Sequence, residues 1–173
     1  MSYAEPGAIR NVQLTDCAAR TIAREVDAAG DGRETGGILL GNINADGVAD
    51  VRYAGDPGPA AVRTQAFFLR DRAHAQRLAD TAFATDGSIW IGEWHTHPST
   101  EPVPSRTDVD TYLTLLTDPE LQFTVIVSII IGSLPPRRTP EIGMIAWACT
   151  LSSITAIPIQ LTDDVDGQGH LPI

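Results

Sequence analysis

Two histidines and an aspartate that lie close together in the chain carry its clearest chemical signal. His95 and His97 stand in the segment GEWHTHPSTEPVPSRTD, residues 92–108, which ends at Asp108. Side chains at positions i and i+2 leave a β-strand on the same face, so these two imidazoles can bind one small cation. Asp108 falls in the first turn of a predicted helix and can fold back towards them. Because two histidines and one carboxylate are a common ligand set for catalytic zinc, the residues predict a hydrolytic site with one zinc per chain.

A zinc hydrolase also needs a base for the proton of the attacking water, and the sequence offers three candidates. Glu93 lies on the same predicted strand face as the histidines, Glu101 lies in the following loop, and Glu34 precedes a predicted strand. Residue type and spacing do not choose among them, because most of the 22 acidic residues are expected to be solvated. Ser105 and Asp108 form S-x-x-D, which by itself is typical of a helix N-cap, and a capping serine can still face a metal site.

The elements around these residues follow from hydrophobic periodicity and from turn residues. Helices are predicted at 14–30, 71–87 and 105–117. Strands are predicted at 36–43, 48–55, 63–70, 88–97, 121–131, 142–151 and 155–161. This order predicts an α+β fold in which a mixed sheet is flanked by helices. The length suits one domain, residues 1–161, followed by an acidic and flexible C-terminal tail, residues 162–173.

Several side chains receive predictions of their own. Phe83 is expected on the buried face of the second helix, where His74 is expected to be solvated. Trp90 and Trp94 are separated by an even number of positions in a predicted strand and are therefore expected to share one face. On that face Trp94 would come close to the cleft that holds the metal site.

Composition and charge exclude several classes of partner. The net charge is −10, which disfavours nucleic acid and anionic membranes because both require a basic protein face. All twelve basic residues are arginine. Cys17 and Cys149 form no C-x-x-C pair, which predicts buried thiols in a reducing compartment. Residues 1–10 do not have the pattern of a signal peptide, and the apolar run 123–132 is too short to span a bilayer, so we expect a cytoplasmic location.

The segment HTHPSTEPVPSRTD reads as H-x-H-P-x6-S-x-x-D and resembles the JAMM motif of JAB/MPN-domain zinc metalloproteases. The upstream ETGGILLG is similar to the glutamate-bearing segment of that family, and the resemblance covers the chain from about residue 34 to residue 132. It implies a curved mixed sheet between helices, a JAB/MPN-like fold with a core like that of cytidine deaminases. It also implies the site residues, in which zinc is bound by His95, His97 and Asp108, Glu34 acts as general base, and Ser105 helps to stabilise the oxyanion. Glu93 becomes a sheet or rim residue.

Within that superfamily, GEWHTHP together with FFLRD before a helix resembles the bacterial Prok-JAB branch. Members of this branch accompany E1- and E2-like proteins and include deconjugating proteases of CBASS-type antiphage systems. The resemblance implies an isopeptidase or peptidase that removes a ubiquitin-like or similarly conjugated protein from its target. Two alternatives stay open, namely a processing hydrolase for the adduct of a sulfur-carrier protein, and a non-catalytic MPN scaffold.

Overall fold

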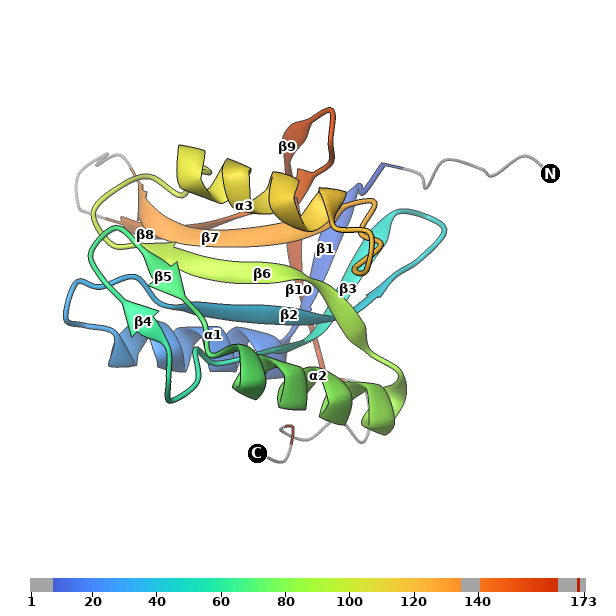
Figure 1. The fold of residues 1–173 in the computed structure, drawn as a ribbon, viewed down its shortest axis with the longest axis horizontal. Helices are drawn as coiled ribbons and strands as arrows, with labels where there is room; N and C mark the ends of the chain where they lie inside the picture. Colours follow the sequence, from blue (N-terminus) through green and yellow to red (C-terminus); the bar gives the residue numbers. More distant parts are fainter. Residues whose placement is uncertain (1–7, 135–140, 165–170, 172–173) are drawn as a thin grey trace.

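The computed structural model describes residues 8–134, 141–164 and 171, and Figure 1 shows their arrangement. The described helices are α1 (Asp16–Ala28), α2 (Arg72–Asp86) and α3 (Arg106–Thr117). The described strands are β1 (Asn11–Thr15), β2 (Gly36–Ile43), β3 (Val48–Ala54), β4 (Val62–Arg63), β5 (Phe68–Leu69), β6 (Ile89–His97), β7 (Ile126–Leu134), β8 (Glu141–Cys149), β9 (Ile154–Ile157) and β10 (Ile159–Thr162).

Eight of these strands form one mixed sheet in the order β10-β1-β3-β2-β6-β7-β8-β9. The pairs β1–β10, β1–β3 and β6–β7 are parallel, and the others are antiparallel. The consecutive strands β9 and β10 pair at opposite edges of the sheet, although only Pro158 separates them. Because one residue links the two edges, the sheet has to curve strongly. The predicted fold class, a curved mixed sheet flanked by helices, is therefore confirmed.

Helices cover the two faces of this sheet with separate hydrophobic clusters. Ala18 and Ile22 of α1 pack on the larger cluster, which contains Trp94 of β6. Helices α2 and α3 pack on the opposite face, and Figure 1 shows α3 lying along β7. Each helix presents an apolar stripe to the sheet, as expected for elements that cover a half-buried surface. The central strands β6 and β7 are thereby shielded from both sides.

Three predicted elements differ from the observed ones. Residues 63–70 form no single strand but the hairpin β4–β5, which turns where the Thr64 amide donates to the Phe67 carbonyl over 2.8 Å. The predicted strand 155–161 is divided by Pro158, which has no N–H to donate to a ladder. The helix predicted to begin at residue 14 is preceded by β1, a strand too short to show a clear period.

A β-bulge in β6 corrects the predicted placement of the tryptophans. The register of β6 against β2 shifts between the pairs Leu39–Gly92 and Leu40–Trp90, so one extra residue lies between them. Trp94 is fully buried in the cluster beneath α1, whereas Trp90 packs with the cluster beneath α2. The prediction that both share one face, with Trp94 near the cleft, is therefore wrong. Trp90 is the residue that lies on the face of Glu93.

Two predictions for α2 are also wrong. Phe83 is 64% exposed and not buried, because the buried stripe of α2 runs through His74, Leu78 and Ala82 and Phe83 lies off it. His74 was expected to be solvated but is buried, and its Nε2 atom lies 2.8 Å from a carboxylate oxygen of Asp56. An acidic partner on a neighbouring loop is not visible in helical periodicity.

The predicted tail, residues 162–173, begins inside a strand. Thr162 belongs to β10 and pairs with Thr15 of β1. Asp164 accepts a hydrogen bond of 2.6 Å from the backbone amide of Cys17, at the start of α1. Of the residues beyond it, only Leu171 is described. Among the described residues, no helix combines the length and apolar character that crossing a membrane requires.

Candidate metal centre

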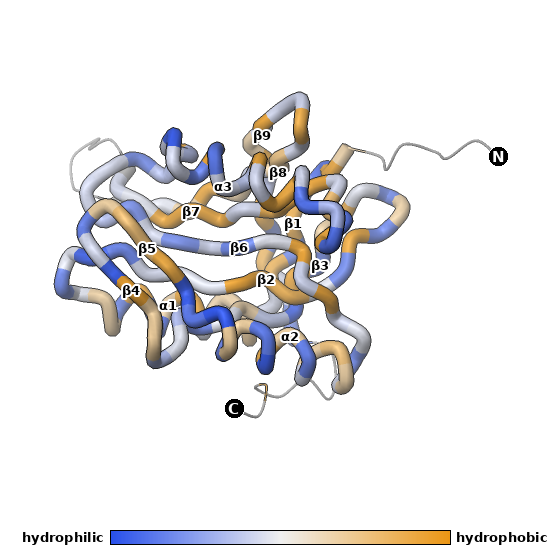
Figure 2. The backbone as a smooth tube through the Cα atoms, in the orientation of Figure 1, coloured by the Kyte–Doolittle hydropathy of each residue, from blue (hydrophilic) through white to orange (hydrophobic). Residues whose placement is uncertain are grey.

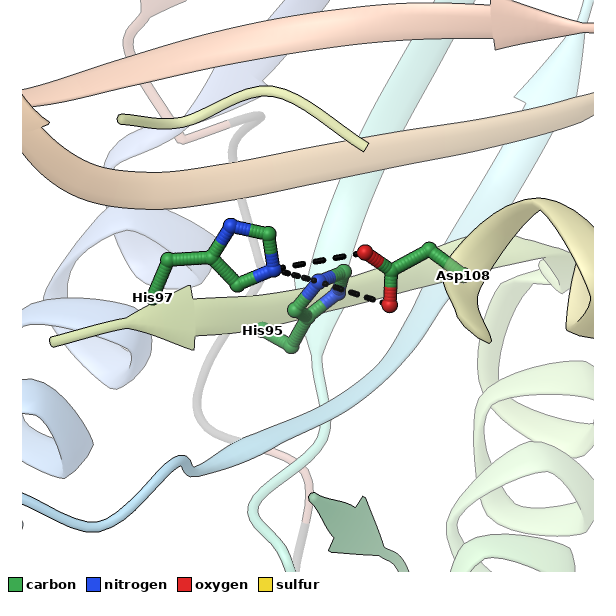
Figure 3. Close-up of side chains that lie close together, drawn as sticks. All are labelled: His95, His97 and Asp108. Carbon is green, nitrogen blue, oxygen red and sulfur yellow. Dashed lines mark hydrogen bonds and ion pairs between the residues drawn. The ribbon is translucent and has the colours of Figure 1, made fainter. Parts of the chain in front are cut away.

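The C-terminal end of β6 and the first turn of α3 bring three potential ligands together. Figure 2 shows that this end of β6 is hydrophilic, while its neighbour β7 is hydrophobic. His95 and His97 project from β6 towards Asp108, as Figure 3 shows. The Nε2 atom of His95 lies 3.3 Å from one carboxylate oxygen of Asp108, and Nε2 of His97 lies 3.3 Å from the other. One ligand atom from each residue lies within 4.8 Å of the other two. The structure thus brings together all three residues predicted as metal ligands.

The hydrogen bonds of the two imidazoles direct both Nε2 atoms into the same space. Nδ1 of His95 lies 2.8 Å from a carboxylate oxygen of Glu93, and Nδ1 of His97 lies 3.2 Å from the Glu101 carbonyl. If both Nδ1 atoms donate, two lone pairs face each other across the 3.0 Å between the Nε2 atoms. A cation is needed between them. Two nitrogens bound to one tetrahedral zinc would lie about 3.3 Å apart, which is close to the distance observed.

Electrostatics agrees with this arrangement. Burial alone would lower the pKa of His95, but the carboxylates of Glu93 and Asp108 raise it to about 10. Burial alone would raise the pKa of Asp108, but hydrogen bonds from the two imidazoles hold it well below its usual value. A site that attracts a proton so strongly onto His95 has an excess of negative charge, which also favours a divalent cation.

Glu93 is the residue whose role the sequence did not reveal. Its side chain is buried, which excludes the predicted rim position, and it accepts hydrogen bonds from His95, from the Ser128 hydroxyl and from the Tyr112 hydroxyl. Burial alone would raise the pKa of Glu93, but His95, Ser128 and Arg70 lower it. A carboxylate that holds the distal nitrogen of a ligand histidine fixes the orientation of the ring. The alternation of side chains along a strand predicts the correct face for Glu93. Its partners, however, lie on β7 and α3, which are distant in the sequence.

Glu34 lies at the mouth of the site, at the end of the loop before β2. Its amide donates to the Thr64 carbonyl over 2.7 Å, and its own carbonyl accepts from Nε of Arg63 over 2.9 Å. Burial raises the pKa of Glu34, whereas His95 and His97 lower it. A carboxylate whose pKa lies above its usual value and that stands near the histidines is suited to accept a proton at neutral pH.

The glycines after Glu34 explain how its loop approaches β6. A Cβ atom on Gly36 would lie 2.3 Å from the Trp94 carbonyl oxygen, and one on Gly37 would lie 1.9 Å from the Gly55 carbonyl oxygen. Neither position has room for a side chain. The segment ETGG thus lets β2 pass close enough to β6 for Glu34 to reach the metal site.

Ser105 and Asp108 form the predicted cap of α3. The Ser105 hydroxyl accepts from the Asp108 amide over 3.2 Å, and the Asp108 carboxylate accepts from the Ser105 amide over 2.6 Å. This capping box fixes the carboxylate that faces the histidines. The Ser105 hydroxyl keeps its own proton for a further acceptor. Capping and the site position therefore coexist, as expected from the sequence.

The loop between the histidines and α3 is fastened to the sheet. The Trp147 indole donates to the Pro102 carbonyl over 3.1 Å, and the Ser133 amide donates to the Thr100 carbonyl over 2.9 Å. Within this loop Glu101 is exposed, and it is its carbonyl that contacts His97. The Glu101 side chain is therefore a poorer candidate for the base than Glu34, which lines the site.

One cleft is lined by four of the five predicted site residues, Glu34, His95, Ser105 and Asp108, whereas His97 lines a neighbouring hollow. It runs between the β4–β5 hairpin and α3, with β6 as its floor. Its lining consists of Glu34, Ala66, Phe67, Phe68, Arg70, Glu93, His95, Ser105, Thr107, Asp108, Thr111 and Tyr112. Such a cleft has the concave shape and the mixed polar and apolar lining that binding sites usually have.

Comparisons with known proteins show which family and which fold this chain resembles. The sequence model of the family Prok-JAB, described as prokaryotic homologs of the JAB domain, matches residues 18–150. A probable metalloprotease of Sinorhizobium fredii is 33% identical over 117 residues, 66% of this chain and 69% of the relative. A CD-NTase/cGAS isopeptidase of Enterobacter hormaechei is 26% identical over 94% of this chain and 87% of the relative. The solution structure of a Desulfitobacterium hafniense protein has the same fold, with a TM-score of 0.64 and 19% identity over 90% of this chain and 95% of that chain.

Proposed function

This chain belongs to the family of prokaryotic homologs of the JAB domain, and on that basis we propose that it is a zinc-dependent isopeptidase. In this proposal it removes a ubiquitin-like or similarly conjugated protein from its target. The observation that carries the proposal is the convergence of His95, His97 and Asp108 on one point, beside a cleft that His95 and Asp108 line. A scaffold has no need of three converging ligands or of a buried carboxylate that orients one of them.

Zinc would be held by the Nε2 atoms of His95 and His97 and by the carboxylate of Asp108. When bound, the ion lowers the pKa of a water molecule to about 7 and polarises the scissile carbonyl. The other steps belong to the protein. Glu34 accepts a proton from the attacking water and returns it to the leaving amine. The Ser105 hydroxyl donates to the oxygen that becomes negatively charged.

The names of the relatives support the class of substrate. One is named a probable metalloprotease, and others, from Enterobacter hormaechei and Vibrio cholerae, are named CD-NTase/cGAS isopeptidases. We therefore infer an amide bond to a conjugated protein as the bond cut, with E1- and E2-like proteins as the source of the conjugate. We further infer that residues 1–161 act as one catalytic domain.

The first experiment is a metal determination on protein purified without chelator, beside His97→Ala and Glu34→Ala. We expect about one zinc per chain in the wild type and in Glu34→Ala, and none in His97→Ala. Both variants should lose cleavage of a ubiquitin-like protein joined through its C-terminus to a fluorescent lysine. No zinc after reconstitution would overturn the proposal and leave a scaffold. Zinc with cleavage of only a linear C-terminal adduct would favour the processing hydrolase.

A further inference from the structure

Arg70 lies in the cleft with donors that no described residue satisfies. It follows β5 directly, and its guanidinium carbon lies 5.8 Å from the centre of the Trp90 ring. The Nε atom is fully enclosed and has no hydrogen-bond partner in the described part of the chain. None of the hydrogen bonds or ion pairs found among the described residues involves Arg70. Arg70 as a whole is half-buried, and an enclosed Nε–H without an acceptor is unusual, because it has lost its hydrogen bond to water and gained none in return.

The carboxylate that attracts Arg70 already has hydrogen-bond partners of its own. Glu93 attracts Arg70 electrostatically, but one of its oxygens accepts from His95 and the other accepts from Ser128 and Tyr112. Three of the roughly four acceptor sites of this carboxylate are thus occupied, and no hydrogen bond among the described residues joins Arg70 to it. The guanidinium is instead held over Trp90, which the β-bulge in β6 brings to this face.

The chemistry of the missing partner follows from the shape of the group. A guanidinium presents parallel N–H donors that match the two oxygens of a carboxylate better than any neutral acceptor. Burial lowers the pKa of Arg70, and the attraction of Glu93 opposes this shift without cancelling it. Because only Nε is enclosed, the terminal nitrogens remain accessible, and an incoming carboxylate would supply acceptors for them and further negative charge.

We propose that Arg70 is a specificity residue that binds an acidic side chain of the substrate segment lying in this cleft. The inference rests on the proposed function, since it takes the cleft as the substrate path. Arg70 lies beside Trp90 and Glu93. On β6, Trp90 precedes His95 by five positions and Glu93 precedes it by two. An extended peptide lying along β6 advances about 3.3 Å per residue, as the strand does, so the acidic residue lies about two to five positions from the scissile bond.

The test measures binding and does not depend on turnover. Fluorescein-labelled octapeptides of neutral sequence, each with one Glu at a scanned position, are titrated against zinc-loaded Glu34→Gln protein and followed by fluorescence anisotropy. Matched peptides carry Gln or Lys at the same position. We expect about tenfold tighter binding of Glu over Gln at one position. Adding Arg70→Gln should abolish this preference without weakening the Gln peptide, and adding Arg70→Glu should shift it to Lys.

Arg72 supplies the matched control, because it is an exposed neighbouring arginine outside the cleft lining. Adding Arg72→Gln should leave the preference unchanged. Arg70→Lys keeps the positive charge but loses the parallel N–H donors of the guanidinium. This variant should retain a reduced preference for the Glu peptide, and it tests the proposal even if Arg70→Gln does not fold. The proposal is overturned if the Glu peptide binds no more tightly than the Gln peptide at every scanned position, which includes the case in which no peptide binds. It is also overturned if Arg70→Gln weakens binding of the Glu and Gln peptides equally. Failure of the proposed function would appear separately, as absence of zinc or of cleavage in protein with Glu34 intact.

Discussion

The two sides of the cleft are built in different ways. On one side, His95, His97 and Glu93 are buried on β6, which pairs with both β2 and β7 in the centre of the sheet. On the other side, the β4–β5 hairpin consists of two-residue strands that pair only with each other. The first side is as rigid as the core that contains it. The second makes few packing contacts and is free to adapt.

The two sides are suited to different tasks, namely metal binding and contact with the substrate. A metal centre needs ligand atoms fixed within a fraction of an ångström, and a closed hydrogen-bond network inside the core supplies that precision. The hairpin contributes Arg63, which holds the backbone of Glu34, and leads directly to Arg70, whose donors are unpartnered. Substrate contacts on such a lightly held element can differ between relatives without disturbing the metal site.

The largest expected effect comes from removing a ligand on the rigid side. Asp108→Asn keeps the size of the side chain and its cap on α3 but offers zinc a neutral and weaker ligand. We expect loss of bound zinc and a fall in turnover of more than about 10³-fold. Metal analysis and a cleavage assay measure the two effects. Asp110→Asn, an exposed position on the same helix, should change neither.

Removing the base, which lies between β2 and the hairpin, should separate metal binding from turnover. Glu34→Gln should retain about one zinc per chain and lose about 10²- to 10⁴-fold in kcat. Glu101→Gln is the control, since its side chain is exposed. If Glu101→Gln lost activity and Glu34→Gln did not, the base would be Glu101 and the assignment made here would be wrong.

A matched pair of leucines tests the packing of the two sides directly. Leu39 of β2 is 0% exposed and Leu69 of β5 is 51% exposed. Leu39→Ala should lower the free energy of unfolding by about 2–5 kcal/mol. Leu69→Ala should change it by no more than about 0.5 kcal/mol. Urea unfolding of both variants gives the comparison, and similar losses would show that the hairpin is part of the core.

Glu93→Gln should weaken the metal site without removing a ligand. The amide can still accept from His95 but lacks the charge, so the affinity for zinc should fall by about 10- to 100-fold. Competition with a chromogenic chelator measures this, with Glu120→Gln, an exposed glutamate, as the control. Unchanged affinity would mean that Glu93 has only a structural role.

The smallest effect is expected at the contact between the two sides. Arg63→Gln removes the hydrogen bond from Nε to the Glu34 carbonyl and should misplace the base, lowering kcat by about tenfold or less. Bound zinc should be unchanged, because none of the ligands contacts Arg63. The exposed Arg77→Gln should leave both quantities unchanged. Lost zinc in Arg63→Gln would contradict the independence of the two sides.

The sequence by itself determined the elements that carry the chemistry. A strand ending in H-x-H and a helix opened by S-x-x-D are local patterns, so the positions of His95, His97, Ser105 and Asp108 followed from period two and from capping. The α+β class followed from the order of strands and helices. These features depend on neighbours in the chain, which the sequence displays directly.

Only the tertiary structure decided which side chains meet across the sheet. The bulge that turns Trp90 towards Arg70 depends on how β6 pairs with β2. This pairing cannot be predicted from the sequence of either strand alone. The burial of Glu93 depends in the same way on Ser128 of β7 and Tyr112 of α3. Contacts between distant segments arise from the packing of the whole chain, which is why periodicity could place Glu93 on the correct face and still not identify its partners.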